Sequence, residues 1–242
     1  MQTIRLGAFL AAFTLLATML AQANPIDDCN QSADIERQID GCTQFLQLDP
    51  FSPHVALAYG RRGEAYVHKG DFARAIADFD QAIQIDPRQA RFLVGRGLAY
   101  RDKGDLDSAL ADFSKAIEID SGFADAFVNR CVAYEDRGQA DLAVQDCTAA
   151  IALNPRDAVA YNDRGVAYEN AGNIDNALAD YSKAIELDPA YRDACANRAV
   201  LYDHKGEKEL AIADYRAALA KNPTPSDRKD IETALERLGA TP

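Results

Sequence analysis

The chain has 242 residues, of which 48% are hydrophobic and 26% are charged, and its formal net charge at pH 7 is −12. Such an acidic surface repels the phosphates of nucleic acids and anionic lipid headgroups, so neither is an expected partner. The same charge also serves solubility alone, and by itself it points to no particular ligand.

The first 23 residues have the composition of a secretory signal peptide. Arg5 supplies a short positive region, residues 6–20 are almost unbrokenly apolar, and residues 21–23 have the Ala-x-Ala pattern of a cleavage site. An uncleaved membrane anchor is the alternative, although the apolar run is short for a span. No lipidation motif precedes Cys29. We expect cleavage after Ala23, a periplasmic or secreted bacterial protein, and no membrane span in the mature chain.

Residues 24–55 precede the first complete unit of a repeat. Within them, residues 34–50 predict one helix, whose end at residues 45–50 has the same pattern as residues 82–87. Residues 26–31 are too few for a full partner helix. We therefore expect this segment to be a half-repeat that caps the array.

A single pattern recurs every 34 positions from Ala56 onward. Each unit has a small residue at position 8, Tyr at position 11, Gly at position 15, and Ala at positions 20 and 27. A repeat of this length indicates structural units that pack only on their neighbours. The five predicted units are residues 56–89, 90–123, 124–157, 158–191 and 192–225.

Two helices are predicted in each unit. Apolar or small residues at positions 4, 8 and 11, and again at 20, 21, 24, 27 and 28, have helical spacing. The glycine at position 15 suits a left-handed turn between the helices, and Asp71, Asp105 and Asn173 are placed to cap the second helix. After the fifth unit, residues 226–242 predict a capping helix with Ser226 as its N-cap.

These positions carry the signature of the tetratricopeptide repeat family, which residues 56–225 resemble closely. The usual Trp at position 4 is replaced in every unit by another residue. The resemblance implies an all-α fold, a right-handed α-solenoid of antiparallel helix pairs. It also implies a non-catalytic scaffold for protein–protein interaction, with a groove lined by the first helix of each unit.

Two charged columns predict an ion pair inside every unit, because position 7 is always Arg and position 23 is always Asp. A ladder of charges that binds a ligand is the alternative, but recognition requires differences between units. Substitution of Arg130 by Ala should lower the melting temperature and leave ligand binding intact. The predicted pairs are Arg62–Asp78, Arg96–Asp112, Arg130–Asp146, Arg164–Asp180 and Arg198–Asp214.

Five cysteines leave at least one unpaired in an oxidising compartment. Cys131 and Cys147 occupy positions 8 and 24 of one unit, on facing helices, and Cys29 and Cys42 occupy positions 11 and 24 of the half-repeat. We predict these two disulfides, which resemble those of exported bacterial relatives, and a buried free thiol at Cys195. The alternative is that all five are simply small core residues.

No catalytic motif, cofactor fingerprint or metal-ligand cluster is present, so we expect neither an enzyme nor a bound cofactor or metal. Function then depends on the groove, where a stripe of apolar residues runs between Asn and acidic side chains. That surface suits an extended peptide with apolar anchors and some positive charge; a merely solvated helix face is the alternative. The candidate groove residues are Glu64, Val67, Leu98, Arg101, Asn129, Val132, Glu135, Asn162, Val166, Glu169, Val200 and Asp203.

Two classes of function remain. One is an adaptor that binds a protein or peptide of the cell envelope through this groove. The other is an accessory subunit of an envelope polysaccharide complex that contacts glycan directly, although few aromatic residues fall at groove positions. Self-association is a weaker third possibility. The Lys and Asn residues that bind C-terminal carboxylates in some family members are absent, because Gly60 and Glu64 stand where the first of them would be.

Overall fold

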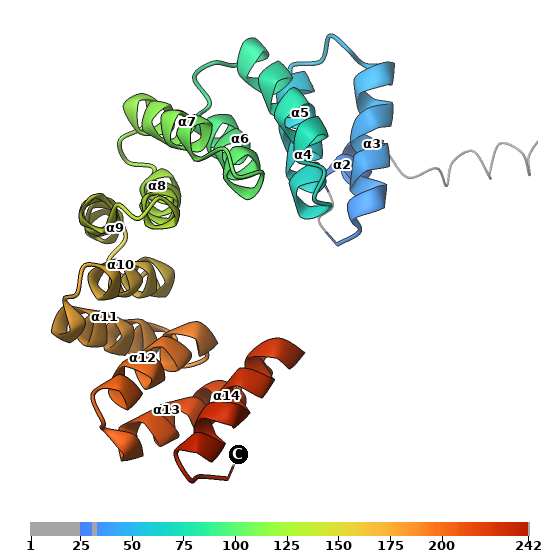
Figure 1. Ribbon diagram of the computed structural model, residues 1–242. Helices are drawn as coiled ribbons and strands as arrows, with labels where there is room; N and C mark the ends of the chain where they lie inside the picture. Colours follow the sequence, from blue (N-terminus) through green and yellow to red (C-terminus); the bar gives the residue numbers. More distant parts are fainter. Residues whose placement is uncertain (1–24, 31–32, 242) are drawn as a thin grey trace, which may run out of the picture. The chain divides into compact units, whose positions relative to one another are not determined.

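Every element that the computed structural model describes is an α-helix (Figure 1). The structure describes residues 25–30 and 33–241, so the predicted signal peptide, residues 1–23, lies outside the described residues. None of the described helices is both long and apolar enough to cross a membrane.

The helices follow one another in pairs. A short helix, α2 (Pro25–Cys29), and a full one, α3 (Ile35–Leu48), precede the repeats. The first helices of the five repeats are α4 (Val55–His68), α6 (Ala90–Asp102), α8 (Ala124–Asp136), α10 (Ala158–Asn170) and α12 (Arg192–His204). The second helices are α5 (Phe72–Ile85), α7 (Leu106–Ile119), α9 (Ala140–Leu153), α11 (Ile174–Leu187) and α13 (Lys208–Leu219). Helix α14 (Pro225–Arg237) follows the last pair.

The turn between the two helices of a repeat depends on a glycine in the left-handed region. Gly104 has a φ of 89°, and no atom lies within 4 Å of the place where its Cβ would be. The backbone conformation alone therefore favours glycine here. In the next residue, the Asp105 side chain accepts a hydrogen bond from the backbone N–H of Ser108 and caps α7.

Two predicted caps differ from the structure. Asn173 occupies the N-cap of α11 but makes no side-chain capping hydrogen bond, so only its position matches. Helix α14 is capped by Thr224, whose hydroxyl accepts from the N–H of Asp227, and not by Ser226. Pro225 explains the difference, because proline has a helical φ and no N–H, which suits the first helical position.

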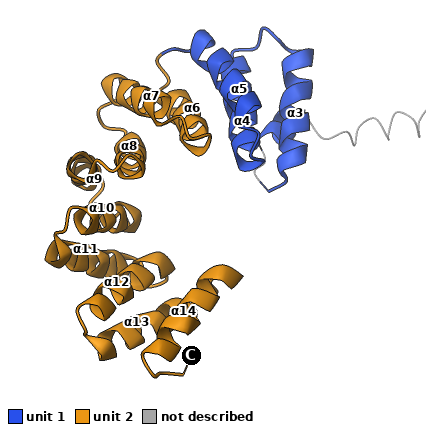
Figure 2. Ribbon diagram, in the orientation of Figure 1, with its two compact units in different colours: residues 1–87 blue, residues 88–242 orange. Residues whose placement is uncertain are grey.

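The chain divides into two compact units, residues 1–87 and 88–242 (Figure 2). In the first, α3 packs against α2 and α4, and α4 packs against α5. In the second, each first helix packs against its own second helix and against the second helix of the preceding repeat within the unit. The first helices also contact one another in series, α6 with α8, α8 with α10, and α10 with α12. The second unit thus has a continuous surface of first helices.

The core depends on small residues where helices meet. The alanines at positions 20 and 27 of every repeat are fully buried, for example Ala109 and Ala116. Gly97 faces the ring of Phe113 so closely that a Cβ on it would lie 2.5 Å from the ring edge. Larger side chains at these positions would push the helices apart.

Candidate functional site

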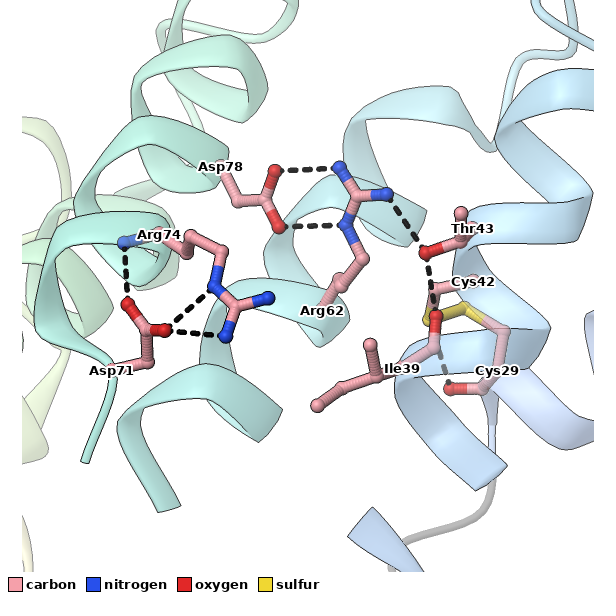
Figure 3. Close-up of polar contacts among 8 residues, drawn as sticks. All are labelled: Cys29, Ile39, Cys42, Thr43, Arg62, Asp71, Arg74 and Asp78. Carbon is pink, nitrogen blue, oxygen red and sulfur yellow. Dashed lines mark hydrogen bonds and ion pairs between the residues drawn. A yellow bond between two sulfur atoms is a disulfide. The ribbon is translucent and has the colours of Figure 1, made fainter. Parts of the chain in front are cut away.

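The Arg–Asp pair is present in each repeat, and it is part of the scaffold. In Figure 3, Arg62 donates from Nε and Nη2 to the two carboxylate oxygens of Asp78, at 2.7 and 2.8 Å. The aspartate is only 6% exposed. The hydrogen bonds that Arg62 donates to Asp78 raise the pKa of Arg62, more than burial lowers it. The same two-point contact joins Arg96–Asp112, Arg130–Asp146, Arg164–Asp180 and Arg198–Asp214.

The arginines also reach the preceding helix pair. Arg62 Nη1 donates to the hydroxyl of Thr43 at 3.0 Å, and Arg130 Nη1 donates to Ser114 Oγ at 3.0 Å. Arg164 and Arg198 make corresponding bonds to Thr148 and Ser182. In these repeats the guanidinium bonds a carboxylate of its own helix pair and a hydroxyl of the preceding pair. Its role is therefore to hold consecutive helix pairs together.

The two predicted disulfides are confirmed, Cys29–Cys42 and Cys131–Cys147. The first joins α2 to α3 and is drawn in Figure 3. Cys195 is a buried free thiol, as predicted, and Lys221 Nζ lies 3.4 Å from its sulfur. The two disulfides and the free thiol are all buried in the core, away from the surface that a partner could contact.

The predicted binding residues lie on the first helices. Glu64 and Val67 are on α4, in the first compact unit. The other ten are on α6, α8, α10 and α12 of the second unit, where the series of helices forms what we call the first-helix face. All ten are half-buried except Asn162, which is buried. On α6, α8 and α10 they are Leu98, Arg101, Asn129, Val132, Glu135, Asn162, Val166 and Glu169, and on α12 they are Val200 and Asp203.

A row of amides links consecutive helices on this face. Asn197 Nδ2 on α12 donates to Asn162 Oδ1 on α10 at 3.0 Å. Asn162 Nδ2 in turn donates to Asp163 Oδ1 at 3.2 Å. At the C-terminal end of α10, Asn170 donates to Glu135 Oε2 on α8. These contacts hold the acidic groups in place without neutralising them.

Two carboxylates on the face are poorly solvated. Burial raises the pKa of Asp163 to about 6, although the bond from Asn162 and the charge of Arg101 oppose the shift. Burial also raises the pKa of Glu135, whose Oε1 is buried and has no hydrogen-bond partner within the described part of the chain. An acceptor in this state is costly unless a donor reaches it. Within the described part of the chain, no donor compensates this oxygen of Glu135.

The other two acidic candidates on this face, Glu169 and Asp203, already have partners within the chain. Glu169 Oε2 accepts a 2.8 Å hydrogen bond from the hydroxyl of Tyr181; burial, and then this bond, raise the pKa of the tyrosine. Asp203 has a side chain that is 8% exposed and forms an ion pair with Arg237 of α14. Glu169 and Asp203 therefore stabilise the packing between helices through these partners.

Sequence reasoning gave no binding role to α14. Asp227, Asp230 and Ile231 of this helix line a pocket with α12. The signal that could have found them is the period itself, because these residues lie 34 positions after residues of α12 at the predicted groove positions. Among residues 25–30 and 33–241, no three His, Cys, Asp or Glu side chains are grouped so that they could hold a metal ion.

Models of the tetratricopeptide repeat match residues 43–90 and 60–124, residues 158–191 and residues 193–225. No curated protein sequence matches the chain significantly.

Solved structures of such repeats are similar to it. The crystal structure of MamA is 29% identical, with 66% of this chain and 93% of that chain covered and a TM-score of 0.58. YrrB, described as a TPR protein with an unusual peptide-binding site, is 24% identical and covers 81% of this chain and 99% of its own, with a TM-score of 0.57. A tetratricopeptide repeat protein from Parabacteroides merdae ATCC 43184 is 18% identical, covers 88% and 86%, and has a TM-score of 0.71.

Proposed function

The chain belongs to the tetratricopeptide repeat family, and on this premise we propose that it is a non-catalytic adaptor of the bacterial cell envelope. In this proposal residues 1–23 export the protein to the periplasm or the exterior. The first-helix face of residues 88–242 then holds an extended segment of a partner protein.

One observation carries the proposal: the first-helix face contains half-buried carboxylates, Glu135 and Asp163, that form no ion pair within the described residues. Glu135 Oε1 has no hydrogen-bond partner within the described residues, and burial raises the pKa of Asp163 to about 6. Keeping such groups costs stability, whereas the charges of the Arg–Asp pairs are fully matched. A partner that supplies N–H donors or a positive charge would recover this cost on binding.

The apolar residues between these carboxylates give the segment its anchors. Val132, Val166 and Val200 occupy the same position on α8, α10 and α12, and all three are half-buried. A peptide that crosses the three helices can place alternate side chains on the valines. YrrB shows that a protein of this fold carries a peptide-binding site, as its description states.

The test is capture of partners from envelope extract on immobilised protein, followed by binding of the purified partner. We expect Glu135→Lys to abolish binding, because it places a like charge against a basic segment at the centre of the face. Glu118→Lys is the matched control, since Glu118 is 66% exposed on the second helix α7. Equal binding by both variants would place the contact elsewhere on the molecule.

Export has its own test. Fusion of residues 1–30 to alkaline phosphatase, which folds actively only in an oxidising compartment, should give active enzyme in cells. Replacement of Leu10 and Leu15 by Arg in the same fusion should abolish that activity, because the apolar run is interrupted. Activity that survives this change would contradict the signal peptide.

A further inference from the structure

A pocket of about 320 Å³ lies between α12 and α14, at the C-terminal end of the repeats. Its lining includes the apolar side chains of Val200 of α12 and of Ile231 and Ala234 of α14, together with Tyr215. Aspartates also line it. The pocket therefore offers both kinds of group that an amphipathic side chain needs, apolar surface and negative charge.

Helix α14 continues the series of first helices, which explains why the pocket belongs to the binding face. Four of the five α12 residues that line the pocket stand at positions 2, 5, 6 and 9 of the fifth repeat, and the other, Arg192, stands at position 1. The residues 34 positions after these four line the same pocket from α14. In chain order the α12 set is Asp193, Ala196, Asn197 and Val200, and the α14 set is Asp227, Asp230, Ile231 and Ala234.

The charges around the pocket do not balance. Arg192 bridges the two helices, with Nη2 at 2.7 Å from Asp193 Oδ1 and Nη1 at 3.0 Å from Asp227 Oδ2. Asp230 also lines the pocket, and its side chain forms no ion pair or hydrogen bond within residues 25–30 and 33–241. Three aspartates and one arginine thus line the pocket, and the lining keeps a net negative charge.

We propose that this pocket receives a lysine or arginine side chain of the partner segment, an inference that rests on the proposed peptide binding. The aliphatic part of that side chain packs on Val200, Ile231 and Ala234, and its cationic end pairs with Asp230. An apolar side chain of the same length would cover Asp230 without pairing it, and an acidic one would be repelled. The pocket therefore fixes the position of a positive charge at one end of the bound segment.

Peptides selected from a random phage-displayed library on the purified protein are the probes. We expect them to share one basic residue, and replacement of that residue by norleucine should weaken binding at least tenfold. Asp230→Asn should remove this preference, so that both peptides bind with similar affinity. Glu236→Gln, an exposed change on the same helix outside the pocket, should leave the tenfold preference intact.

The outcomes separate the pocket from the proposed function. Selected peptides that lack a basic residue would overturn the proposed role of the pocket. So would a preference for the basic residue over norleucine that Asp230→Asn leaves unchanged. If those peptides nevertheless lose binding in Glu135→Lys, peptide recognition by the first-helix face still stands. If no peptide can be selected, both the pocket proposal and the proposed peptide binding are rejected. The same holds if neither Asp230→Asn nor Glu135→Lys changes the binding of the selected peptides.

Discussion

The second and third repeats solve the same packing problem in different ways. In the second, Gly97 on α6 lies against the ring of Phe113 on α7, which is fully buried. In the third, the same two positions hold Cys131 and Cys147, which form a disulfide across the hairpin. The glycine leaves room for the ring, whereas the two cysteines join the same two positions by a covalent bond.

This difference shows which repeat depends on the redox environment of the protein. A glycine–ring contact works under any redox condition, but a disulfide persists only in an oxidising compartment. The third repeat is therefore the part of the second unit whose stability requires oxidation. This dependence agrees with the proposal that the protein is exported.

The largest effect is expected from removing the ring in the second repeat. Phe113→Ala should destabilise the protein by about 3–5 kcal/mol, because it leaves a cavity between α6 and α7 that Gly97 cannot fill. Urea unfolding followed by circular dichroism measures this loss. Phe51→Ala is the control, because Phe51 is 97% exposed. Equal curves for the two variants would show that the ring contributes nothing.

The next effect comes from opening the disulfide of the third repeat. Replacement of Cys131 and Cys147 by Ala should cost about 3 kcal/mol, the value expected for a loop closed over 16 residues. A second variant, Cys131→Gly with Cys147→Phe, imports the pair of the second repeat and should recover most of that loss. Unfolding with and without reductant measures both. If the imported pair fails to recover stability, the two arrangements are not equivalent.

A smaller effect should be common to both kinds of repeat, because they share the Arg–Asp pair. Arg130→Ala leaves Asp146 buried without its partner, and we expect a loss of about 2–3 kcal/mol, below the full value because the arginine keeps some solvent contact. Arg164→Ala should cost the same. Thermal unfolding measures it, with Arg137→Ala as the control, since its partner Asp107 is 80% exposed. Loss of peptide binding with unchanged stability would overturn the scaffold role.

The sequence predicted these internal contacts because they recur at a fixed separation. Arg and Asp lie 16 residues apart in every repeat, as do Cys131 and Cys147, and a hairpin of two helices brings such positions together. A column of identical residues therefore indicates a contact even without a structure. The helix pairs and the left-handed glycine turns were predictable for the same reason.

The contacts on the first-helix face were less predictable, because they join different residues of successive first helices. Asn197 meets Asn162, and Asn170 meets Glu135, both across 35 positions. Each of these pairs occurs once, so no repeated pattern of residues in the sequence predicts it. The burial of Asp163 likewise depends on its particular neighbours. Here the sequence predicted which helices carry the candidate residues, but not which of their carboxylates lack a partner among the described residues.

The smallest effect tests this face through pH. Because burial raises the pKa of Asp163 to about 6, the folded state favours the protonated carboxyl, and the associated stability is present below about pH 4 and is lost as pH rises through 6. Asp163→Asn should remove that loss and stabilise the protein at pH 7 by about 1 kcal/mol, after allowance for solvent. Asp125→Asn, an exposed change on α8, is the control.

The same carboxyl distinguishes a binding face from a solvated one. A bound cation favours the ionised form of Asp163, so affinity for a basic peptide should rise between pH 5 and pH 7, and binding at pH 6 should release protons. Calorimetry in buffers of different ionisation enthalpy measures that release. In Asp163→Asn the affinity should be independent of pH over this interval. If the wild-type affinity is equally flat, the partner does not reach Asp163, and its burial serves only the packing of α10.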